Sequence, residues 1–266
     1  MIIQLRLLHI FILMGELKEV IFNKDNADQS VYPFSMPFFE QTKKLRIHPK
    51  VTYLVGENGS GKSTLLEAIA VASGLNAEGG TANFTFDTRV SHSELHKYLT
   101  LSKGTNRVTD GFFLRSESFF NLATEIEIRD NDPDSIGGGR IIDYYGGKSL
   151  HEQSHGESFW ALFQKRFGGN GLYLLDEPEA ALSPSRQMGM LIRMHELISQ
   201  RSQFIIATHS PILLAYPDAL IYEFSDEGIR QKSYKETGLF QTYNEFFQDP
   251  SQMVNRLLDS WMGDDE

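Results

Sequence analysis

The chain has 266 residues, of which 41% are hydrophobic and 12% aromatic, enough for a sizeable core and too many for a disordered protein. Its formal charge of −10 argues against a uniformly basic, nucleic-acid-coating surface, although it leaves room for a local basic groove. Cysteine is absent, so disulfides and thiolate metal sites are excluded. Since no stretch approaches the ~20 apolar residues of a membrane span, we expect a soluble, cytoplasmic protein.

Residues 1–55 predict strands, the first over Leu5–Met14 and the last over Val51–Val55. An aromatic connection between them contains Tyr32 and Phe34, for which core packing is favoured over stacking on a nucleotide base. A basic cluster precedes the last strand and reads more readily as a solvated strand face than as a phosphate-contacting edge. It consists of Lys43, Lys44, Arg46, His48 and Lys50.

The segment after this strand, Gly-Glu-Asn-Gly-Ser-Gly-Lys-Ser-Thr, matches the P-loop pattern G-x-x-x-x-G-K-[ST] at every fixed position. Good helix-forming residues follow it, so the motif has its required context of strand, loop and helix. Lys62 is expected to reach the β- and γ-phosphates, and the Ser63 hydroxyl to bind Mg²⁺. The sequence therefore predicts binding of ATP with Mg²⁺ by Gly56, Glu57, Asn58, Gly59, Ser60, Gly61, Lys62, Ser63 and Thr64.

Beyond the P-loop helix, strand and helix patterns alternate, which predicts an α/β fold with a mostly parallel, helix-covered sheet. The predicted strands are Gly111–Leu114, Leu172–Leu175, Phe204–Thr208 and Leu220–Phe224, and the predicted helices are Ser91–Leu101, Met188–Ser199 and Pro250–Trp261.

Polar residues end two of these strands. Asp176 and Glu177 directly follow Leu172–Leu175, where Asp176 can hold the Mg²⁺ shell and Glu177 can polarise the attacking water. His209 ends the next strand and is expected to reach the γ-phosphate. The predicted catalytic residues are Glu177, His209 and Lys62.

The motifs together resemble those of the ATP-binding-cassette ATPases: the P-loop, Ser154-His155-Gly156-Glu157, Leu174-Leu175-Asp176-Glu177-Pro178 and Thr208-His209-Ser210. The residues within these motifs resemble those of the soluble SMC and RecF branch, and most closely those of small stand-alone bacterial ATPases. This resemblance implies a P-loop NTPase with an N-terminal antiparallel β subdomain and a small helical signature subdomain. It also implies that two copies sandwich ATP, with Ser154 and Gly156 acting on the partner's nucleotide, Glu177 as general base, Asp176 and Ser63 on the Mg²⁺ side, and His209 as switch residue.

On this basis we expect a single ATPase domain over residues 1–266. Its expected parts are N-terminal strands (1–55), a helical and signature insertion (75–160), a core with the acidic strand end and the switch residue (170–225) and a C-terminal helix (240–266).

Two features depart from the resembled family. Ser183 stands where transporter ATPases usually carry Asp, and no glutamine occurs from residue 65 to 152, where the family has one. Glu117 or Ser116 is the best substitute, with Glu117 as a candidate Mg²⁺ ligand.

A zinc site is also suggested by one motif, because His151-Glu152-Gln153-Ser154-His155 spells H-E-x-x-H. Glycines flank this motif on both sides, which disfavours the continuous helix that such a site needs.

Three functions remain open from the sequence. The favoured one is a homodimeric ATPase that drives or gates a partner protein or DNA in maintenance or defence. The ATP-binding subunit of a membrane transporter, working with a permease, is less favoured because of Glu179 and Ser183. A nucleotide-gated interaction module with little turnover is disfavoured by Glu177.

Overall fold

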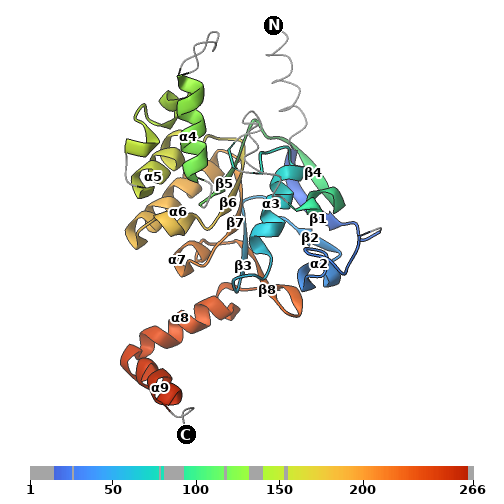
Figure 1. Cartoon of the computed structure of the whole chain (residues 1–266), viewed down its shortest axis with the longest axis vertical. Coiled ribbons are helices and arrows are strands. Elements are labelled where there is room, and N and C mark those ends of the chain that lie inside the picture. Colours follow the sequence, from blue (N-terminus) through green and yellow to red (C-terminus); the bar gives the residue numbers. More distant parts are fainter. Residues whose placement is uncertain are drawn as a thin grey trace.

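Six strands of the described chain form one central sheet in the order β5-β6-β7-β3-β8-β9 (Figure 1). The computed structural model describes residues 15–25, 27–77, 79–80, 93–116, 119–131, 140–152 and 155–262. The strands are β3 (Val51–Gly56), β5 (Asp110–Arg115), β6 (Gly171–Asp176), β7 (Gln203–Ala207), β8 (Leu220–Ser225) and β9 (Gly228–Lys232). Neighbouring strands pair in parallel, except that β9 is antiparallel to β8. The predicted α/β fold with a mostly parallel sheet is confirmed.

Both faces of this sheet are buried, which is why its strands are almost uninterrupted apolar runs. On β6, Tyr173 and Leu175 point into one core, whereas Leu172 and Leu174 point into the other. The first core lies against α5 (His155–Lys165), α6 (Pro184–Ser199) and α7 (Pro211–Leu214). The second lies against α2 (Pro37–Gln41) and α3 (Lys62–Ala72).

A smaller antiparallel sheet, β2-β1-β4, packs beside α3. Its strands are β1 (Gly15–Phe22), β2 (Lys44–Arg46) and β4 (Leu99–Arg107). The helix predicted over Ser91–Leu101 is wrong: Glu94–Tyr98 forms a short 3₁₀ helix, and Leu99 then begins β4. Pairing of Leu99 with Phe22 of β1 explains the difference, because a strand partner distant in sequence outweighs local helix propensity. The strand expected over Leu5–Met14 lies outside the described residues.

A helical region joins β5 to β6 and contains α4 (Phe119–Asp130) and α5. Short 3₁₀ helices at Ile141–Tyr145 and Leu150–Glu152 link them. The rings of Phe119 and Phe159 pack with centroids 5.8 Å apart, so α4 and α5 share the first core.

The C-terminal arm consists of α8 (Gly238–Gln248) and α9 (Pro250–Met262), and it projects from the body beyond α7 (Figure 1). The sequence predicted a C-terminal helix within residues 240–266, including Pro250–Trp261, whereas the structure has two helices in this region, separated at Asp249. Among the described helices, none has the length and apolarity of a membrane span.

Strand register gathers the predicted functional segments at one edge of the sheet. Asp176 at the end of β6 lies opposite Ala207 of β7, and Ala207 lies opposite Leu54 of β3. The P-loop, the acidic pair and His209 therefore leave the sheet side by side, at what we call the carboxyl edge. Ligands of open parallel sheets bind at such an edge.

Candidate active site

The phosphate loop connects β3 to α3 and is shaped by glycines in left-handed backbone conformations. Gly61 has φ +98°, and a Cβ at this position would lie 2.4 Å from the buried ring of Phe38. Any side chain at residue 61 would displace Phe38 or the loop. The loop delivers its backbone N–H groups and the N-terminus of α3 to one point, the arrangement that binds phosphate.

Lys62 is 4% exposed, and its ammonium donates hydrogen bonds to the carbonyl oxygens of Gly56 (2.8 Å) and Glu57 (2.9 Å). Burial lowers the pKa of Lys62, while the nearby carboxylates of Glu177 and Asp176 act in the opposite direction. The ammonium is thus held over the loop by two charge-assisted hydrogen bonds to main-chain carbonyl oxygens.

Ser63 and Asp176 come together although 113 positions separate them in the sequence. The Ser63 hydroxyl donates to Asp176 Oδ1 at 2.9 Å, and Asp176 is 8% exposed. Hydroxyl and carboxylate oxygens are the hard donors that Mg²⁺ prefers.

Ser116 supports this acidic strand end from β5. Its hydroxyl donates to the main-chain carbonyl oxygens of Glu177 at 2.7 Å and Asp176 at 3.2 Å, so it contacts the backbone of the acidic pair. Glu117, the other candidate for the missing glutamine, lies outside the described residues.

Glu177 occupies a left-handed backbone conformation, with φ 48° and ψ 53°, that is uncommon for a residue with a side chain. Its N–H donates to the Ala207 carbonyl at 2.9 Å, which helps hold this strained geometry. Such strain is often stored at functional sites. The half-exposed Glu177 carboxylate turns toward His209, with 3.6 Å between Oε1 and Nε2.

His209 Nε2 is covered from solvent and makes no hydrogen bond with the described residues. Burial, and secondarily the charge of Lys62, lowers the pKa of His209. The imidazole is therefore neutral at pH 7, with its Nε2 free to donate to or accept from a ligand.

Glu179 is a site residue that the sequence did not single out for a role. Its Oε1 accepts a hydrogen bond from the His209 backbone N–H at 2.5 Å, whereas its buried Oε2 has no partner in the described chain. Burial raises the pKa of Glu179. Its position in Asp-Glu-Pro-Glu was a visible signal, but the contact that defines it lies 30 residues away.

At the signature segment, Gly156 opens α5 in close contact with the 3₁₀ helix Pro178–Ala181 that follows Glu177. A Cβ on Gly156 would lie 2.7 Å from the Ala181 carbonyl oxygen. The signature helix and the acidic strand end are therefore packed together within one chain. Ser154 lies outside the described residues.

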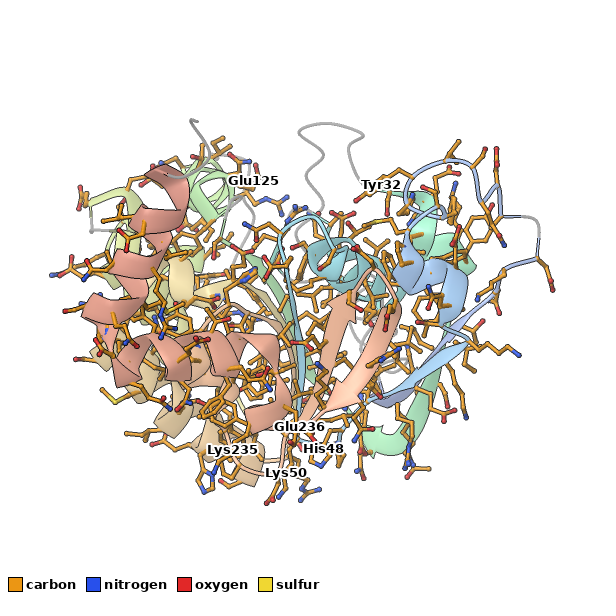
Figure 2. The ribbon with its side chains drawn as sticks, turned by 90° about the horizontal axis from the view of Figure 1, so that it is seen from below. Tyr32, His48, Lys50, Glu125, Lys235 and Glu236 are labelled. Atoms are coloured by element: carbon orange, nitrogen blue, oxygen red, sulfur yellow. The ribbon has the colours of Figure 1, made fainter. Side chains whose placement is uncertain are left out.

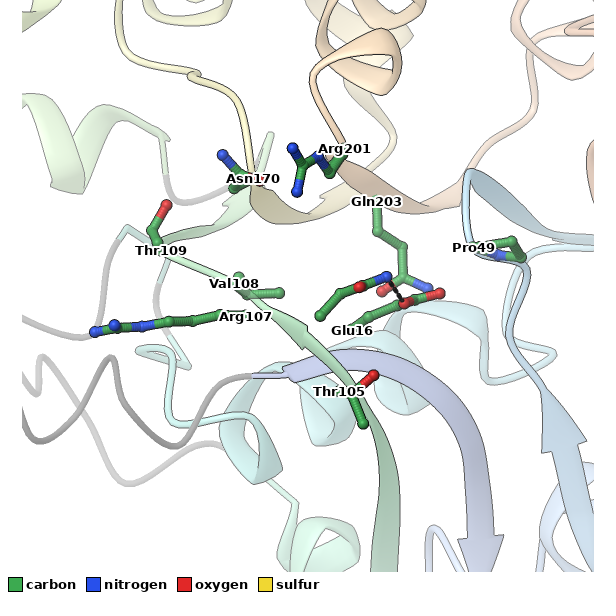
Figure 3. Close-up of a pocket in the computed structure, with 10 residues that line it drawn as sticks. Glu16, Pro49, Thr105, Arg107, Val108, Thr109, Asn170, Arg201 and Gln203 are labelled. Atoms are coloured by element: carbon green, nitrogen blue, oxygen red, sulfur yellow. Dashed lines mark hydrogen bonds between the residues drawn. The ribbon is translucent and has the colours of Figure 1, made fainter.

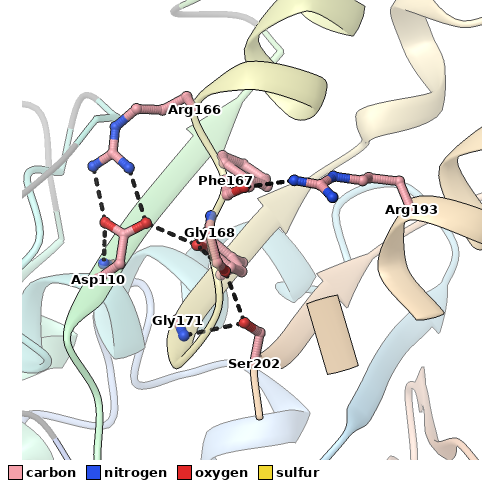
Figure 4. Close-up of polar contacts among 9 residues, drawn as sticks. Asp110, Arg166, Phe167, Gly168, Gly171, Arg193 and Ser202 are labelled. Atoms are coloured by element: carbon pink, nitrogen blue, oxygen red, sulfur yellow. Dashed lines mark hydrogen bonds and ion pairs between the residues drawn. The ribbon is translucent and has the colours of Figure 1, made fainter. Parts of the chain in front are cut away.

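The far end of α5 is anchored by a polar network at the amino ends of β5 and β6 (Figure 4). Arg166, directly after α5, makes a bidentate ion pair with Asp110 at 2.8 and 2.9 Å. Tyr173 Oη donates to the same carboxylate at 2.7 Å, and the Gly168 carbonyl accepts from Ser202 Oγ at 2.9 Å. The signature helix is thereby tied to β6, the strand that ends in Asp176.

Phe34 and Tyr32, the two aromatic residues considered for contact with a nucleotide base, differ in their exposure to solvent. Phe34 is buried and packs edge-on against Tyr98 and Phe39. Tyr32 is 62% exposed, and its hydroxyl lies 2.5 Å from Thr64 Oγ1 at the start of α3. Core packing, the favoured interpretation of both residues, holds for Phe34 and is wrong for Tyr32.

The basic cluster lies away from this site. His48 and Lys50 precede β3, at the opposite end of the strand from the P-loop, and Figure 2 shows them far from Tyr32. Lys44 pairs with Glu19 on an exposed strand face, at 3.0 Å. The interpretation as a solvated face therefore agrees with their placement.

The H-E-x-x-H segment does not form one helix. His151 and Glu152 belong to the 3₁₀ helix Leu150–Glu152, and α5 begins at His155. Among the described residues, no group of three or more His, Cys, Asp or Glu side chains is placed to hold a metal ion.

Two cavities lie at opposite edges of the central sheet. One, of about 470 Å³, is lined by Gly56, Glu57, Thr208 and His209 of the site together with residues of α8. The other, of about 480 Å³, lies at the amino ends of the strands, where Asn170 and Arg201 meet β4 (Figure 3). Only the first adjoins the P-loop.

The residues present fit a nucleoside triphosphate with Mg²⁺. The Ser60 hydroxyl and His209 Nε2 are both buried and unpartnered among the described residues, and both belong to segments at the carboxyl edge. Buried polar atoms normally have partners, so these two indicate a polar ligand. Lys62 supplies the countercharge, and Ser63 with Asp176 supplies the metal's oxygen donors.

Two family models match successive parts of the chain. One, described as "AAA domain", matches residues 35–144, and the other, described as "AAA domain, putative AbiEii toxin, Type IV TA system", matches residues 149–215. No curated protein matches the chain.

Solved structures with a related fold include an ATP-binding subunit of an ABC transporter, at 15% identity over 87% of this chain and 99% of that chain, with a TM-score of 0.47. A nucleotide-free ATP-binding cassette from an ABC transporter is 19% identical over 83% of this chain and 93% of that chain, with a TM-score of 0.48. The SMC head domain from Thermotoga maritima is 15% identical over 82% of this chain and 99% of that chain, with a TM-score of 0.42. The P-loop lies in the first matched region and the acidic end of β6 in the second, so this chain is similar to AAA domains over residues 35–144 and 149–215.

Proposed function

We propose that this chain binds ATP with Mg²⁺ and hydrolyses the γ-phosphate bond in a site completed by a second copy of itself. One observation carries the proposal. Within one cluster lie the buried Lys62 ammonium, the Ser63–Asp176 pair and His209 Nε2 beside Glu177, which can supply the phosphate countercharge, the metal ligands and the base for phosphoryl transfer to water.

Each side chain has a distinct task in this proposal. The loop N–H groups and Lys62 hold the phosphates, and Lys62 leaves its two carbonyl acceptors to do so. Ser63 and Asp176 hold Mg²⁺, which when bound neutralises charge on the phosphate oxygens. Glu177 accepts a proton from the attacking water, while neutral His209 orients the water or the γ-phosphate through Nε2.

Glu179 and Ser116 act on these residues indirectly. The Glu179 carboxylate accepts a hydrogen bond from the His209 N–H and so fixes the backbone of His209. The Ser116 hydroxyl donates to the Glu177 carbonyl oxygen and so fixes the backbone of Glu177. Both are positioning residues, because they hydrogen-bond the main chain of His209 and Glu177.

The partner's Gly156 segment completes the site from the other protomer, by resemblance to ATP-binding-cassette enzymes. Alone, one protomer leaves the Glu177 and His209 side chains about a third or more exposed, at 43% and 35%. Closure by a second copy would exclude bulk water and add donors at the helix N-terminus of α5. The resulting cycle of closure and release would drive or gate a partner protein or a DNA-bound complex.

Mixing two inactive variants tests this arrangement. Lys62→Ala removes the phosphate-binding ammonium, and Ser154→Arg blocks the signature that faces the other protomer. Each homodimer then has two defective sites, whereas the heterodimer keeps one site with an intact loop and an intact signature. We expect ATPase activity in the mixture to exceed that of either variant alone. No gain, with heterodimers demonstrated by differential tagging, would refute the site in trans.

A further inference from the structure

The C-terminal arm, α8 and α9, exposes apolar side chains to an unusual degree. No residue of α8 is buried. Tyr243, Phe246 and Phe247 on α8 are exposed, the last at 68%, and so are Val254 and Leu258 on α9. Helices of 11 and 13 residues are only marginally stable in water without packing, so these exposed apolar side chains favour a surface that covers them.

The base of the arm is fixed to the protein body. The Gly238 N–H donates to Glu223 Oε1 at 2.7 Å, and the Tyr234 hydroxyl just before α8 donates to the Pro211 carbonyl at 3.0 Å. Thr237 caps α8 by accepting from the Phe240 N–H at 3.2 Å. The arm therefore starts from a defined position and presents its outer part in a defined direction.

The exposed aromatic side chains of α8 begin at the cavity beside the P-loop. The cavity of about 470 Å³ next to the P-loop has Glu57 and His209 on one side and Leu239, Thr242 and Tyr243 of α8 on another. The Tyr243 ring then stacks near Phe247, with centroids 5.9 Å apart, and Phe247 contacts Phe246 at 5.5 Å. An aromatic row thus runs from the rim of the phosphate cavity along α8 to Phe247.

The charges of the arm restrict what can cover it. Glu245, Asp249 and Asp259 outnumber Arg256 in the described arm. A negative surface disfavours anionic lipid headgroups and nucleic-acid phosphates, which basic helices bind. The exposed aromatic and aliphatic side chains of the arm instead suit an apolar patch on a protein surface.

We propose that the arm docks on a second copy of this chain when two protomers close over ATP. This inference rests on the proposed function, because the second protomer must approach the same cavity that Tyr243 lines. The aromatic row extends the nucleotide-facing surface outward, so that closure over His209 also covers Phe247. ATP occupancy and burial of the arm are coupled, and the arm contributes affinity that the phosphate site alone lacks.

The test compares two aspartate substitutions on α8 in the full-length Glu177→Gln protein. Phe247→Asp places a charge on the aromatic row, whereas Gln241→Asp places the same charge one turn below Glu245, on the polar face. With ATP and Mg²⁺, sedimentation velocity should show Phe247→Asp weakening dimerisation about tenfold or more, as loss of one buried aromatic anchor does. Gln241→Asp should change the dissociation constant less than about twofold. Both variants should keep the ATP-induced rise in melting temperature, which shows that fold and nucleotide binding are intact.

The outcomes separate the two proposals. If Glu177→Gln itself stays monomeric with saturating ATP, the sandwich of the proposed function fails, and docking of the arm fails with it. If Glu177→Gln dimerises and Phe247→Asp dimerises equally well, only the arm proposal is overturned. Binding of the wild-type arm to phosphatidylglycerol vesicles, abolished by Phe247→Asp while dimerisation persists, would assign the surface to lipid and also overturn it.

A crosslinking measurement identifies the occupant directly. Because the chain has no cysteine, Val254→Cys in the Glu177→Gln protein accepts a single photoreactive maleimide label on α9. Mixed light and heavy isotopic protein should give crosslinks between copies with ATP and at least about fivefold fewer without it. Crosslinks confined to one copy would contradict docking on the second.

Discussion

Replacing Gly156 with alanine tests the packing of the signature helix against the catalytic strand end. The new Cβ would lie 2.7 Å from the Ala181 carbonyl oxygen and 3.1 Å from Arg186 Nη1, and the backbone oxygen cannot move without shifting the 3₁₀ helix after Glu177. Overpacking of this kind costs about 1–3 kcal/mol. Better helix propensity returns at most about 1 kcal/mol, and less in the first turn of a helix.

We therefore expect Gly156→Ala to lower the free energy of unfolding by roughly 1–2 kcal/mol, or the melting temperature by about 2–8 °C for a domain of this size. ATP turnover should fall as well, because displacement of Ala181 is transmitted to Glu177. Urea denaturation and an ATPase assay measure the two effects.

Gly168 provides the matched control, since a Cβ there meets nothing within 4 Å. Gly168→Ala should change stability by no more than about 0.5 kcal/mol and leave turnover at the wild-type rate. A Gly156→Ala protein as stable and active as the wild type would refute the close packing of α5 on the acidic strand end.

Three further substitutions test separate parts of the account. ATP at about 100 times its dissociation constant should stabilise the wild type by roughly 2.7 kcal/mol, and Lys62→Ala should remove most of this shift in a thermal melt; an equal shift in both proteins would exclude the P-loop lysine from binding. Burial raises the pKa of Glu179, so the wild type loses stability as pH rises above 4.5 and through that raised pKa. Glutamine does not titrate, so the Glu179→Gln variant escapes this loss. The free energy of unfolding of the variant, relative to that of the wild type, should therefore increase as pH rises above 4.5. Urea titrations at several pH values measure this difference, and a difference independent of pH would contradict the buried carboxyl. Asp110→Asn should cost roughly 3 kcal/mol in urea unfolding, because it leaves the Arg166 guanidinium without a charged partner; a cost below about 0.5 kcal/mol would show that the network of Figure 4 anchors nothing.

The sequence identified the P-loop and the ends of β6 and β7 because their spacing and order survive as a linear pattern. Lys62, Ser63 and Asp176 could be named in advance, since parallel strands bring their carboxyl ends to one edge. Glu179 and Ser116 could not be assigned their roles in this way. Their roles depend on backbone groups of His209 and Glu177, which only the folded register brings within hydrogen-bonding distance.

Fold prediction failed where tertiary pairing or an overlooked signal decided the structure. Leu99 pairs with Phe22 across the small sheet, a contact that no local pattern reveals. The start of α8 at Gly238, two residues before the expected C-terminal helix, did leave a signal, because Thr237 is a suitable N-cap and Leu239, Tyr243 and Phe246 repeat at helical spacing.

In the proposed function, the carboxyl edge of the sheet hydrolyses ATP with Glu177 as the general base. The most direct measurement is the steady-state ATPase rate of Glu177→Gln beside the wild type, with ATP binding to both followed by isothermal titration. We expect the wild type to turn over ATP and the variant to bind it unchanged while hydrolysing it roughly 10²–10⁴ times more slowly. Equal hydrolysis rates in the two proteins, at equal ATP occupancy, would contradict the account.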